Sequence, residues 1–283
     1  MSAGERIAFV LGGGGLRGAV QIGMLRALLE RGVVPDVIVG TSIGAINGAI
    51  VAKTPSLDAL DDLFEAWMSP EAASVYGDSF ATQFVRLVRT RTHLNSPAPL
   101  RRMFERVLGA DTRFEDLAVP LRVVAASIER AAERVFDSGP LIPAVLASSS
   151  VPGLLPPTTI DGETFIDGGI VNSIPIGPAV DAGATTIFVL QVGRIETPLV
   201  APRTAVQTAQ MAFEVARRHR FAHDVATLPD GVRLHVLPSG GTLKGDSSVL
   251  SYRRMETVRT RIDLAYAAST VYLDEQVPKG GRP

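Results

Sequence analysis

Short apolar runs alternate with amphipathic stretches along most of this chain. Apolar runs of the length of a β-strand lie at 7–11, 37–39, 121–126, 134–136, 185–192 and 232–237. Apolar residues at helical spacing lie between and after these runs, at 19–30, 57–68, 80–89, 100–108, 141–148, 204–226 and 252–276. Strands and helices that alternate in this way are typical of a largely parallel sheet with helices on both faces. The pattern predicts an α/β fold of three layers, α/β/α, with a mostly parallel central sheet and a functional site at the carboxyl ends of its strands.

The composition fits a globular chain and narrows the classes of function. The 283 residues are 46% hydrophobic and 20% charged, so there is enough apolar surface for a sizeable core. The formal net charge of −1 argues against a nucleic acid as partner, because such proteins present strongly basic surfaces. The chain has no cysteine, which excludes disulfides, thiolate metal sites and a thiol nucleophile.

No targeting or membrane-spanning segment is evident in the sequence. The residues before the first apolar run are polar or small, and that run of five residues is too short for a signal peptide. No stretch reaches the roughly 18 apolar residues that a spanning helix needs. We therefore expect a cytoplasmic protein, and we expect residues 278–283 to be a frayed tail. Nothing in the sequence indicates an oligomeric state.

The most informative motif begins where the second apolar run ends. Residues 37–39 (Val-Ile-Val) lead through Gly-Thr-Ser-Ile-Gly at 40–44 into a helical stretch of small residues. The pattern G-x-S-x-G is typical of a nucleophile elbow, in which a tight strand-to-helix turn lifts the serine hydroxyl above the sheet edge. Glycine is favoured on both sides of the serine because it tolerates close backbone approach. Ser42 is the predicted nucleophile, and Gly40 and Gly44 support the turn.

A glycine loop, GGGGLRG at residues 12–18, lies between the first apolar run and the helix that follows it. Backbone N–H groups in such a loop favour negative charge, either a phosphate or a developing oxyanion. The letters fit a dinucleotide fingerprint, but that reading needs an acidic residue at the end of the second strand, where this chain has Ser42. A P-loop needs a Gly-Lys-Ser/Thr sequence, which does not follow. An oxyanion hole for Ser42 fits better, and a non-catalytic module that binds an anion or a nucleotide is the alternative.

Two kinds of general base compete for the proton of Ser42. An extended run at 163–167 ends in Asp167-Gly168-Gly169, which is either an ordinary turn or a carboxylate base at a strand end. A Ser-His-Asp triad would instead use one of the four histidines of the chain, His93, His219, His223 and His235. None of these histidines follows a strand end in the usual way. The residues favour a carboxylate base and leave a Ser-His-Asp esterase as the alternative.

Four blocks of sequence, in this order, resemble the patatin-like phospholipase family, whose members use a Ser-Asp dyad without histidine. The family's motif G-G-G-x-R/K-G is similar to residues 13–18, and its elbow is similar to residues 40–44. Its D-G-G/A motif is similar to residues 167–169, and its Pro-bearing segment before the aspartate resembles residues 147–156. The resemblance covers residues 5–190.

The resemblance implies a role for each of these motifs. Ser42 is the nucleophile and Asp167 the general base, and the backbone of Gly13, Gly14 and Gly15 forms the oxyanion hole. The supporting loop residues are Arg17, which fixes the glycine loop, and Gly18, Gly40, Gly44, Gly168 and Gly169. The implied fold is a single patatin-like acyl hydrolase domain over residues 1–277. The implied substrate is a carboxylic ester of a phospholipid, a lysophospholipid or another acyl lipid.

A Ser-Asp dyad requires a particular environment for its aspartate. An aspartate with its usual pKa near 4 is a weak base, so the site must desolvate Asp167 and hold it within hydrogen-bond reach of Ser42. An acyl-serine then forms and is released by water. This mechanism needs no metal and no cofactor, and we predict neither. His219 and His223 have the spacing of a metal pair on a helix, but no third ligand is nearby, and a solvated basic face is favoured.

A lipid substrate implies transient contact with a membrane surface, here the inner face of the membrane. The segment 67–99 holds the only tryptophan and has apolar residues at helical spacing, so it could form a lid or a lipid-facing surface. Ordinary core packing gives the same stripe and is favoured.

Overall fold

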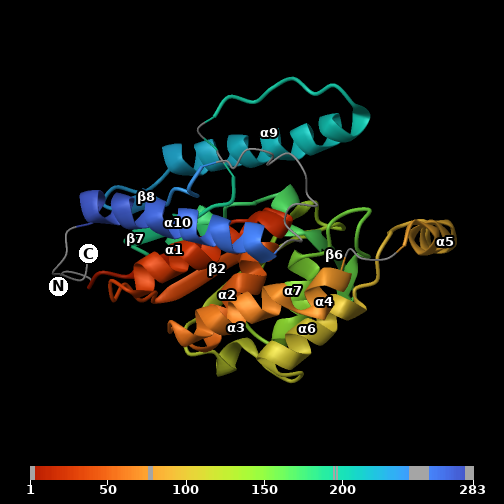
Figure 1. Cartoon of the computed structure of the whole chain (residues 1–283), viewed down its shortest axis with the longest axis horizontal. Helices are drawn as coiled ribbons and strands as arrows, with labels where there is room; N and C mark the ends of the chain where they lie inside the picture. The colour runs from red at the N-terminus through yellow and green to blue at the C-terminus, as the bar shows by residue number, and fades with distance from the viewer. Residues whose placement is uncertain (1–3, 76–78, 194, 196, 242–254, 278–283) are drawn as a thin grey trace.

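The computed structural model describes residues 4–75, 79–193, 195, 197–241 and 255–277, and its strands form one sheet (Figure 1). The expected tail at 278–283 and the first residues of the helix expected at 252–276 lie outside the described residues. The sheet has eight strands in the order β5-β6-β3-β2-β1-β7-β8, and β4 also pairs with β3. The strands are β1 (Ile7–Leu11), β2 (Val37–Thr41), β3 (Leu121–Ser127), β4 (Ala132–Phe136), β5 (Thr158–Ile160), β6 (Glu163–Asp167), β7 (Thr186–Leu190) and β8 (Arg233–Val236).

The sheet has a parallel part and an antiparallel part. Strands β3, β2, β1, β7 and β8 pair parallel with one another, whereas β4 and β6 pair antiparallel with β3, and β5 pairs antiparallel with β6. Every residue of β1, β2 and β7 is buried, as is usual for parallel strands covered on both faces. The expected mostly parallel sheet is confirmed, with an antiparallel edge that the sequence pattern did not indicate.

Helices cover both faces of the sheet. Figure 1 shows α9 on one side of the molecule and α2, α3 and α6 on the opposite side. The helices are α1 (Val20–Leu29), α2 (Ile43–Lys53), α3 (Asp58–Met68), α4 (Pro70–Ser74), α5 (Phe80–Thr90), α6 (Ala98–Leu108), α7 (Leu141–Ser148), α8 (Ile176–Asp181), α9 (Ala205–Ala226) and α10 (Met255–Gln276), and the 3₁₀ turns are η1 (Gly15–Ala19), η2 (Phe114–Asp116) and η3 (Gly168–Ile170). Within the described ranges, no helix combines the length and the apolar character needed to cross a bilayer.

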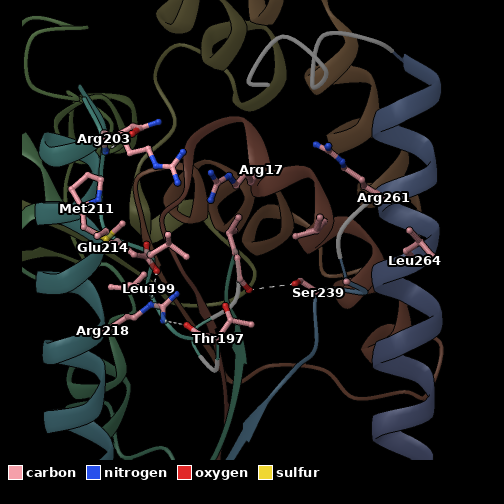
Figure 2. A pocket seen from close by; sticks show the side chains of 18 residues that line it. Arg17, Thr197, Leu199, Arg203, Met211, Glu214, Arg218, Ser239, Arg261 and Leu264 are labelled. Atoms are coloured by element: carbon pink, nitrogen blue, oxygen red, sulfur yellow. Dashed lines mark hydrogen bonds and ion pairs between the residues drawn. The ribbon is translucent and has the colours of Figure 1, made fainter. Parts of the chain in front are cut away.

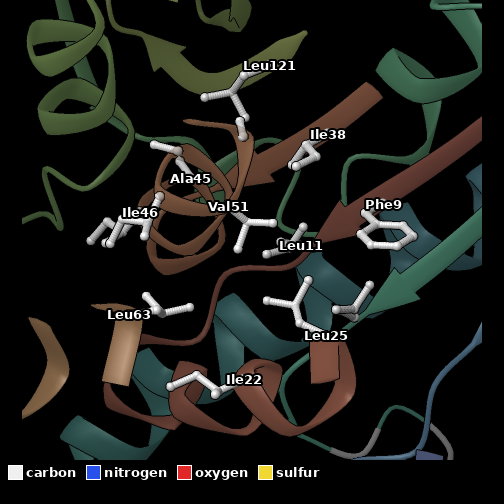
Figure 3. Close-up of a cluster of buried hydrophobic side chains, with 14 of the residues drawn as sticks. Phe9, Leu11, Ile22, Leu25, Ile38, Ala45, Ile46, Val51, Leu63 and Leu121 are labelled. Atoms are coloured by element: carbon white, nitrogen blue, oxygen red, sulfur yellow. The ribbon is translucent and has the colours of Figure 1, made fainter. Parts of the chain in front are cut away.

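Side chains along β1 alternate between two cores. Phe9 and Leu11 point into the larger core, together with residues of α1, α2, α3, α6, α7 and α10, and Figure 3 shows them near Leu25. Ala8 and Val10 point into the smaller core, which residues of α8 and α9 cover. This period of two gives each face of the sheet its own helical layer. The three-layer α/β/α fold expected from the sequence is therefore confirmed.

The predicted strands and helices are all present, with ends that differ by no more than two residues inside the described ranges. The sequence analysis missed α4, α8 and β5, because runs of three to six residues are too short to show a period. A signal for β5 does exist, since Asp161-Gly162 joins it to β6 with positive φ at both residues. Asp-Gly is typical of such a two-residue hairpin turn.

The packing of α1 against α10 generates a prediction for Gly23, in the middle of α1. A Cβ on Gly23 would lie 2.1 Å from the backbone oxygen of Ile262 in α10, and backbone atoms yield less readily than side-chain ends. Gly23→Ala should lower the free energy of unfolding by about 2 kcal/mol or more in urea denaturation followed by circular dichroism. Gly177→Ala in α8 is the matched control, because its Cβ would meet nothing within 4 Å, and it should leave stability unchanged or raise it. Equal stability of Gly23→Ala and the wild type would contradict the close contact of α1 and α10.

Candidate active site

Ser42 lies in the sharp turn between β2 and α2. It precedes the first residue of α2 and has φ 56° and ψ −122°, a strained conformation for a residue other than glycine. The turn is so tight that a Cβ on Gly40 would lie 2.5 Å from the oxygen of Gly44. A Cβ on Gly44 would lie 1.9 Å from the oxygen of Leu11, at the end of β1. The structure thus has the elbow geometry expected for G-x-S-x-G, and both glycines are needed for close backbone packing.

Ser148, at the end of α7, holds the backbone of the elbow. The N–H of Ser42 donates to Ser148 Oγ at 2.8 Å, and this hydroxyl donates in turn to the carbonyl of Val124 in β3 at 2.6 Å. All three residues are buried. The sequence analysis did not assign Ser148 a role, although it lies in the segment 147–156 that carries part of the family resemblance.

Asp167, the last residue of β6, lies beside Ser42. Ser42 Oγ donates to Asp167 Oδ2 at 2.6 Å, and the N–H of Gly169 donates to Asp167 Oδ1 at 2.8 Å. The sheet register explains this meeting, because Thr41 pairs with Val124 of β3 and Asp167 pairs with the next residue, Ala125. The antiparallel run of β6 therefore ends where the parallel strand β2 also ends.

Burial makes Asp167 a stronger base than an exposed aspartate. Desolvation raises the pKa of its carboxyl from 3.8 to about 6, while the hydrogen bonds from Ser42 and from the N–H of Gly169 act in the opposite direction. At neutral pH the carboxylate is ionised and accepts the Ser42 proton in a hydrogen bond. The arrangement has what proton transfer from a serine hydroxyl to a carboxylate requires, namely a short distance and an elevated base pKa.

The glycine loop passes directly over Ser42. A Cβ on Gly13 would lie 3.4 Å from Ser42 Cβ, so the loop backbone touches the elbow. The N–H of Gly13, however, donates to the carbonyl of Ser173 at 2.8 Å and is engaged. The amides of Gly14 and Gly15 have no acceptor among the described residues. Of the three glycines expected to form an oxyanion hole, these two have amides available for a ligand.

Two buried polar side chains, Gln21 and Asn47, fix the glycine loop. Gln21 Nε2 donates to the carbonyls of Gly12 at 2.9 Å and Leu190 at 2.7 Å. Asn47 Nδ2 donates to Gln21 Oε1 at 2.7 Å and to the carbonyl of Gly18 at 3.0 Å. The sequence analysis expected Arg17 to fix the loop, but the Arg17 side chain is exposed and makes no hydrogen bond within the described residues. Gln21 and Asn47 were missed because a polar residue in an amphipathic stretch resembles part of a solvated face.

An apolar cavity of about 320 Å³ opens beside Ser42. Its walls come mainly from α2, α3, α4 and α6, and they are formed by Gly15, Leu16, Ser42, Ile43, Ile46, Ile50, Leu63, Ala66, Trp67, Met68, Ser69, Ala72, Val75, Leu100, Met103 and Ser149. Ser149 Oγ is buried in this wall and has no hydrogen-bond partner among the described residues. Trp67, the only tryptophan of the chain, also lines the cavity. Its Nε1 donates to Asn47 Oδ1 at 3.1 Å.

The structure places no histidine of the described chain in contact with Ser42 or Asp167. His235 lies on β8, stacks on Phe188 at 5.0 Å and approaches the hydroxyl of Tyr272. The other three lie in the loop after α5 (His93) and on α9 (His219 and His223). The described residues contain no group of three or more His, Cys, Asp or Glu that could hold a metal ion.

The raised pKa of Asp167 predicts a pH-dependent effect on stability. Because the folded-state pKa exceeds the unfolded value, ionised Asp167 weakens the fold; this penalty grows as the pH rises from 3.8 to 6, is complete above pH 6 and is lost well below pH 3.8, where both states hold the proton. Asp167→Asn removes the charge. Relative to the wild type, the variant should therefore gain about 2 kcal/mol of unfolding free energy between pH 4 and pH 8. Denaturant titrations at both pH values measure this gain, and an identical stability difference at both would contradict the assigned pKa.

The chain is similar to a known protein family and to several known proteins. The model of the family "Patatin-like phospholipase" matches residues 9–180. "Patatin-like phospholipase domain-containing protein 7" of Rattus norvegicus is 36% identical over 199 residues, which are 69% of this chain and 14% of that protein. "Lysophospholipase NTE1" of Mycosarcoma maydis is 28% identical over 236 residues, which are 80% of this chain and 12% of that protein. This chain therefore spans only a small part of the length of these relatives.

Among solved structures, the crystal structure of VipD from Legionella pneumophila has a TM-score of 0.54 at 16% sequence identity, over 97% of this chain and 68% of VipD. At this identity the likeness shows a shared fold. The family match extends from the third residue of β1 through the elbow and Asp167 into α8, so it includes every motif of the candidate site. The chain belongs to the patatin-like phospholipase family.

Proposed function

We propose that this chain is a serine acyl hydrolase that cleaves carboxylic esters of lipids, with residues 1–277 acting as a single catalytic domain. The observation that carries the proposal is the 2.6 Å hydrogen bond from Ser42 Oγ to the desolvated carboxylate of Asp167, at the mouth of an apolar cavity. A hydrolase site usually combines a nucleophile, a base of raised pKa and an apolar binding space that lie in contact with one another. The relatives named as phospholipase and lysophospholipase support a lipid substrate.

The reaction has an acylation step and a deacylation step. Ser42 Oγ attacks the ester carbonyl carbon while its proton passes to Asp167 Oδ2, and the oxyanion that develops lies against the amides of Gly14 and Gly15. The intermediate collapses when the bond to the leaving alcohol breaks and Asp167 returns the proton to the alcohol oxygen. Water, deprotonated by the same carboxylate, then attacks the acyl carbon. The bond to Ser42 Oγ breaks, Asp167 returns the proton to Oγ, and the fatty acid leaves. Because Asp167 must be ionised to start each step, activity should decline below pH 6.

The apolar cavity is the proposed site for the acyl chain. An apolar cavity of about 150 Å³ holds one six-carbon ring. The 320 Å³ beside Ser42 is thus large enough for a chain of about 12 carbons. Ser149 Oγ, which is buried in the same wall without a partner among the described residues, is the proposed donor to an ester oxygen of the substrate. A phospholipid, a lysophospholipid or another acyl ester would each fit this description.

Helix α5 is the proposed contact with the lipid surface. It stands away from the layered body of the protein in Figure 1. Val85 and Val88 on this helix are 64% and 61% exposed, and Arg89 and Arg91 lie beside them at its end. Exposed apolar residues next to cations are typical of helices that lie in a membrane interface. The core packing that the sequence analysis favoured for the segment 67–99 is wrong for α5, because Leu87 and Val88 are 38% and 61% exposed, whereas Trp67 lines the cavity.

The first test distinguishes the dyad from a histidine triad. Ser42→Ala should abolish hydrolysis of p-nitrophenyl esters and labelling by a fluorophosphonate probe. Asp167→Asn should lower kcat by at least about 10²-fold, because the amide cannot accept the serine proton. His93→Gln, His219→Gln, His223→Gln and His235→Gln are the controls, and each should retain activity within about tenfold of the wild type. An active Asp167→Asn enzyme together with one inactive histidine variant would establish a triad esterase instead.

The second test addresses the membrane contact. The double variant Val85→Glu/Val88→Glu should lower the hydrolysis of phospholipid in vesicles by at least about tenfold, because two apolar side chains lose their burial in lipid. Its turnover of a soluble p-nitrophenyl ester should equal that of the wild type. Val271→Glu is the matched control, since Val271 on α10 is 57% exposed but lies away from α5 in the chain. A double variant that hydrolyses vesicle lipid at the wild-type rate would exclude α5 as the contact.

A further inference from the structure

A second cavity, of about 800 Å³, lies next to the glycine loop and is lined by Arg17 (Figure 2). Among the residues that the structure describes, the two cavities share no lining residue. Gly15 and Leu16 face the cavity beside Ser42, whereas the next residue, Arg17, lines the second one. Its walls come from the segments after β1, β7 and β8 and from the helices α9 and α10. We name it the switch-point cleft and define it by Arg17, Gly193, Arg203, Arg218, Ser239 and Arg261.

The position of this cleft in the sheet is the one at which open α/β folds bind ligands. The chain moves from β1 to β2 and β3 in one direction and then returns to place β7 and β8 on the other side of β1. At such a topological switch point the connections at the carboxyl ends diverge, and they leave a crevice. Arg17 follows β1, Gly193 follows β7 and Ser239 follows β8, so the cleft occupies that crevice. The dyad does not, because Ser42 follows β2 and Asp167 ends β6.

The charge of the cleft is strongly positive. Its described lining contains four arginines, Arg17, Arg203, Arg218 and Arg261, and one carboxylate, Glu214. Glu214 forms ion pairs with Arg218 at 2.8 Å and with Arg217, just below the lining, at 3.2 Å. Neither Arg17 nor Arg203 forms an ion pair with a carboxylate of the described chain. The one acidic group of the described lining is thus already shared between two cations, and Arg17 and Arg203 are left to pair with a ligand.

Two of these arginines, Arg17 and Arg261, lie close enough for the charge of one to act on the other. In the view of Figure 2, Arg17 lies between Arg203 near the start of α9 and Arg261 on α10. Arg261 is buried, and burial lowers the pKa of its guanidinium, which the charge of Arg17 lowers further. Arg218 is fixed by Glu214 and by a hydrogen bond to the carbonyl of Thr197. Like charges gathered in one cavity repel one another, so the arrangement is stabilised by an anion that contacts several of them.

We propose that the switch-point cleft binds a phosphate group, carried either by a lipid headgroup or by a small soluble phosphate ester. A phosphate presents at least three acceptor oxygens and up to two negative charges, so it can contact several guanidinium groups at once, which a single carboxylate cannot. The volume of about 800 Å³ exceeds what the phosphate alone needs and leaves room for the group that carries it. The ligand would contact the turn η1 at Arg17.

The binding test uses the full chain with Ser42→Ala, so that no turnover occurs and the result does not depend on the proposed hydrolysis. Isothermal titration calorimetry at constant ionic strength measures the binding of inorganic phosphate and glycerol 3-phosphate. A second substitution in the Ser42→Ala chain, either Arg17→Gln or Arg203→Gln, should weaken this binding at least about tenfold. Both arginines are exposed. Arg102→Gln is the matched control, because Arg102 is an exposed arginine on α6 that lines neither cavity, and it should bind like the parent. Circular dichroism verifies that each variant is folded.

Co-sedimentation with phosphatidylcholine vesicles, with and without phosphatidic acid, distinguishes the two sources of phosphate. Binding that requires phosphatidic acid and is lost in Arg17→Gln and Arg203→Gln supports the lipid headgroup. Saturable binding of glycerol 3-phosphate or inorganic phosphate without this vesicle preference supports the soluble ester. The proposal is overturned if no probe binds saturably in either experiment, or if Arg17→Gln and Arg203→Gln bind as tightly as Arg102→Gln.

Discussion

A backbone contact between the start of α2 and the end of β1 holds Ser42 in the conformation on which the site depends. Because a Cβ at residue 44 would lie 1.9 Å from the oxygen of Leu11, only glycine lets α2 begin directly against β1. Ser42 then has φ 56°, a conformation that costs on the order of 1–3 kcal/mol. The close-packed cores on both faces of β1 and β2 keep this conformation populated. The burial of Asp167 adds a second cost, since the desolvation that raises its pKa also weakens the fold. Strain and desolvation are thus concentrated in the two residues that the proposed chemistry uses.

The glycine loop separates two cavities of opposite chemical character. One side is apolar and contains Ser42, and the other carries four arginines. An acyl chain gains free energy by leaving water for the first cavity, whereas a phosphate would pay a large desolvation cost there. In the second cavity the guanidinium groups compensate a phosphate. The loop between them is kept in place by the buried side chains of Gln21 and Asn47, whose amides satisfy carbonyls at both ends of the loop. The two cavities are divided in this way because the glycine loop follows β1. At this strand the order in which the chain adds strands to the sheet reverses.

The features that could be predicted from the sequence are local ones. The strands and longer helices follow from periodicity, which depends only on neighbouring residues. Ser42 was recognisable because a nucleophile elbow needs glycines at fixed spacing around the serine, and the packing of Gly40 and Gly44 agrees with that need. The antiparallel edge was not predicted, because the period of a strand does not indicate which strand it pairs with or in which direction, and β5 has only three residues. Ser148, Gln21 and Asn47 were not predicted either, since hydrogen bonds to distant carbonyls leave no pattern in the chain.

The sequence by itself therefore determined the elements, the elbow at Ser42 and the candidate carboxylate Asp167. The sequence predicted the contact between Ser42 and Asp167 only through the family resemblance, because 125 residues separate them. The tertiary structure decided that contact through the register of β6 on β3, which places Asp167 beside the end of β2. It also decided that the amide of Gly13 bonds to Ser173 while those of Gly14 and Gly15 do not bond within the described chain. The arginine cleft is likewise a property of the fold alone, since Arg17, Arg203 and Arg261 meet only where three distant segments converge at one edge of the sheet.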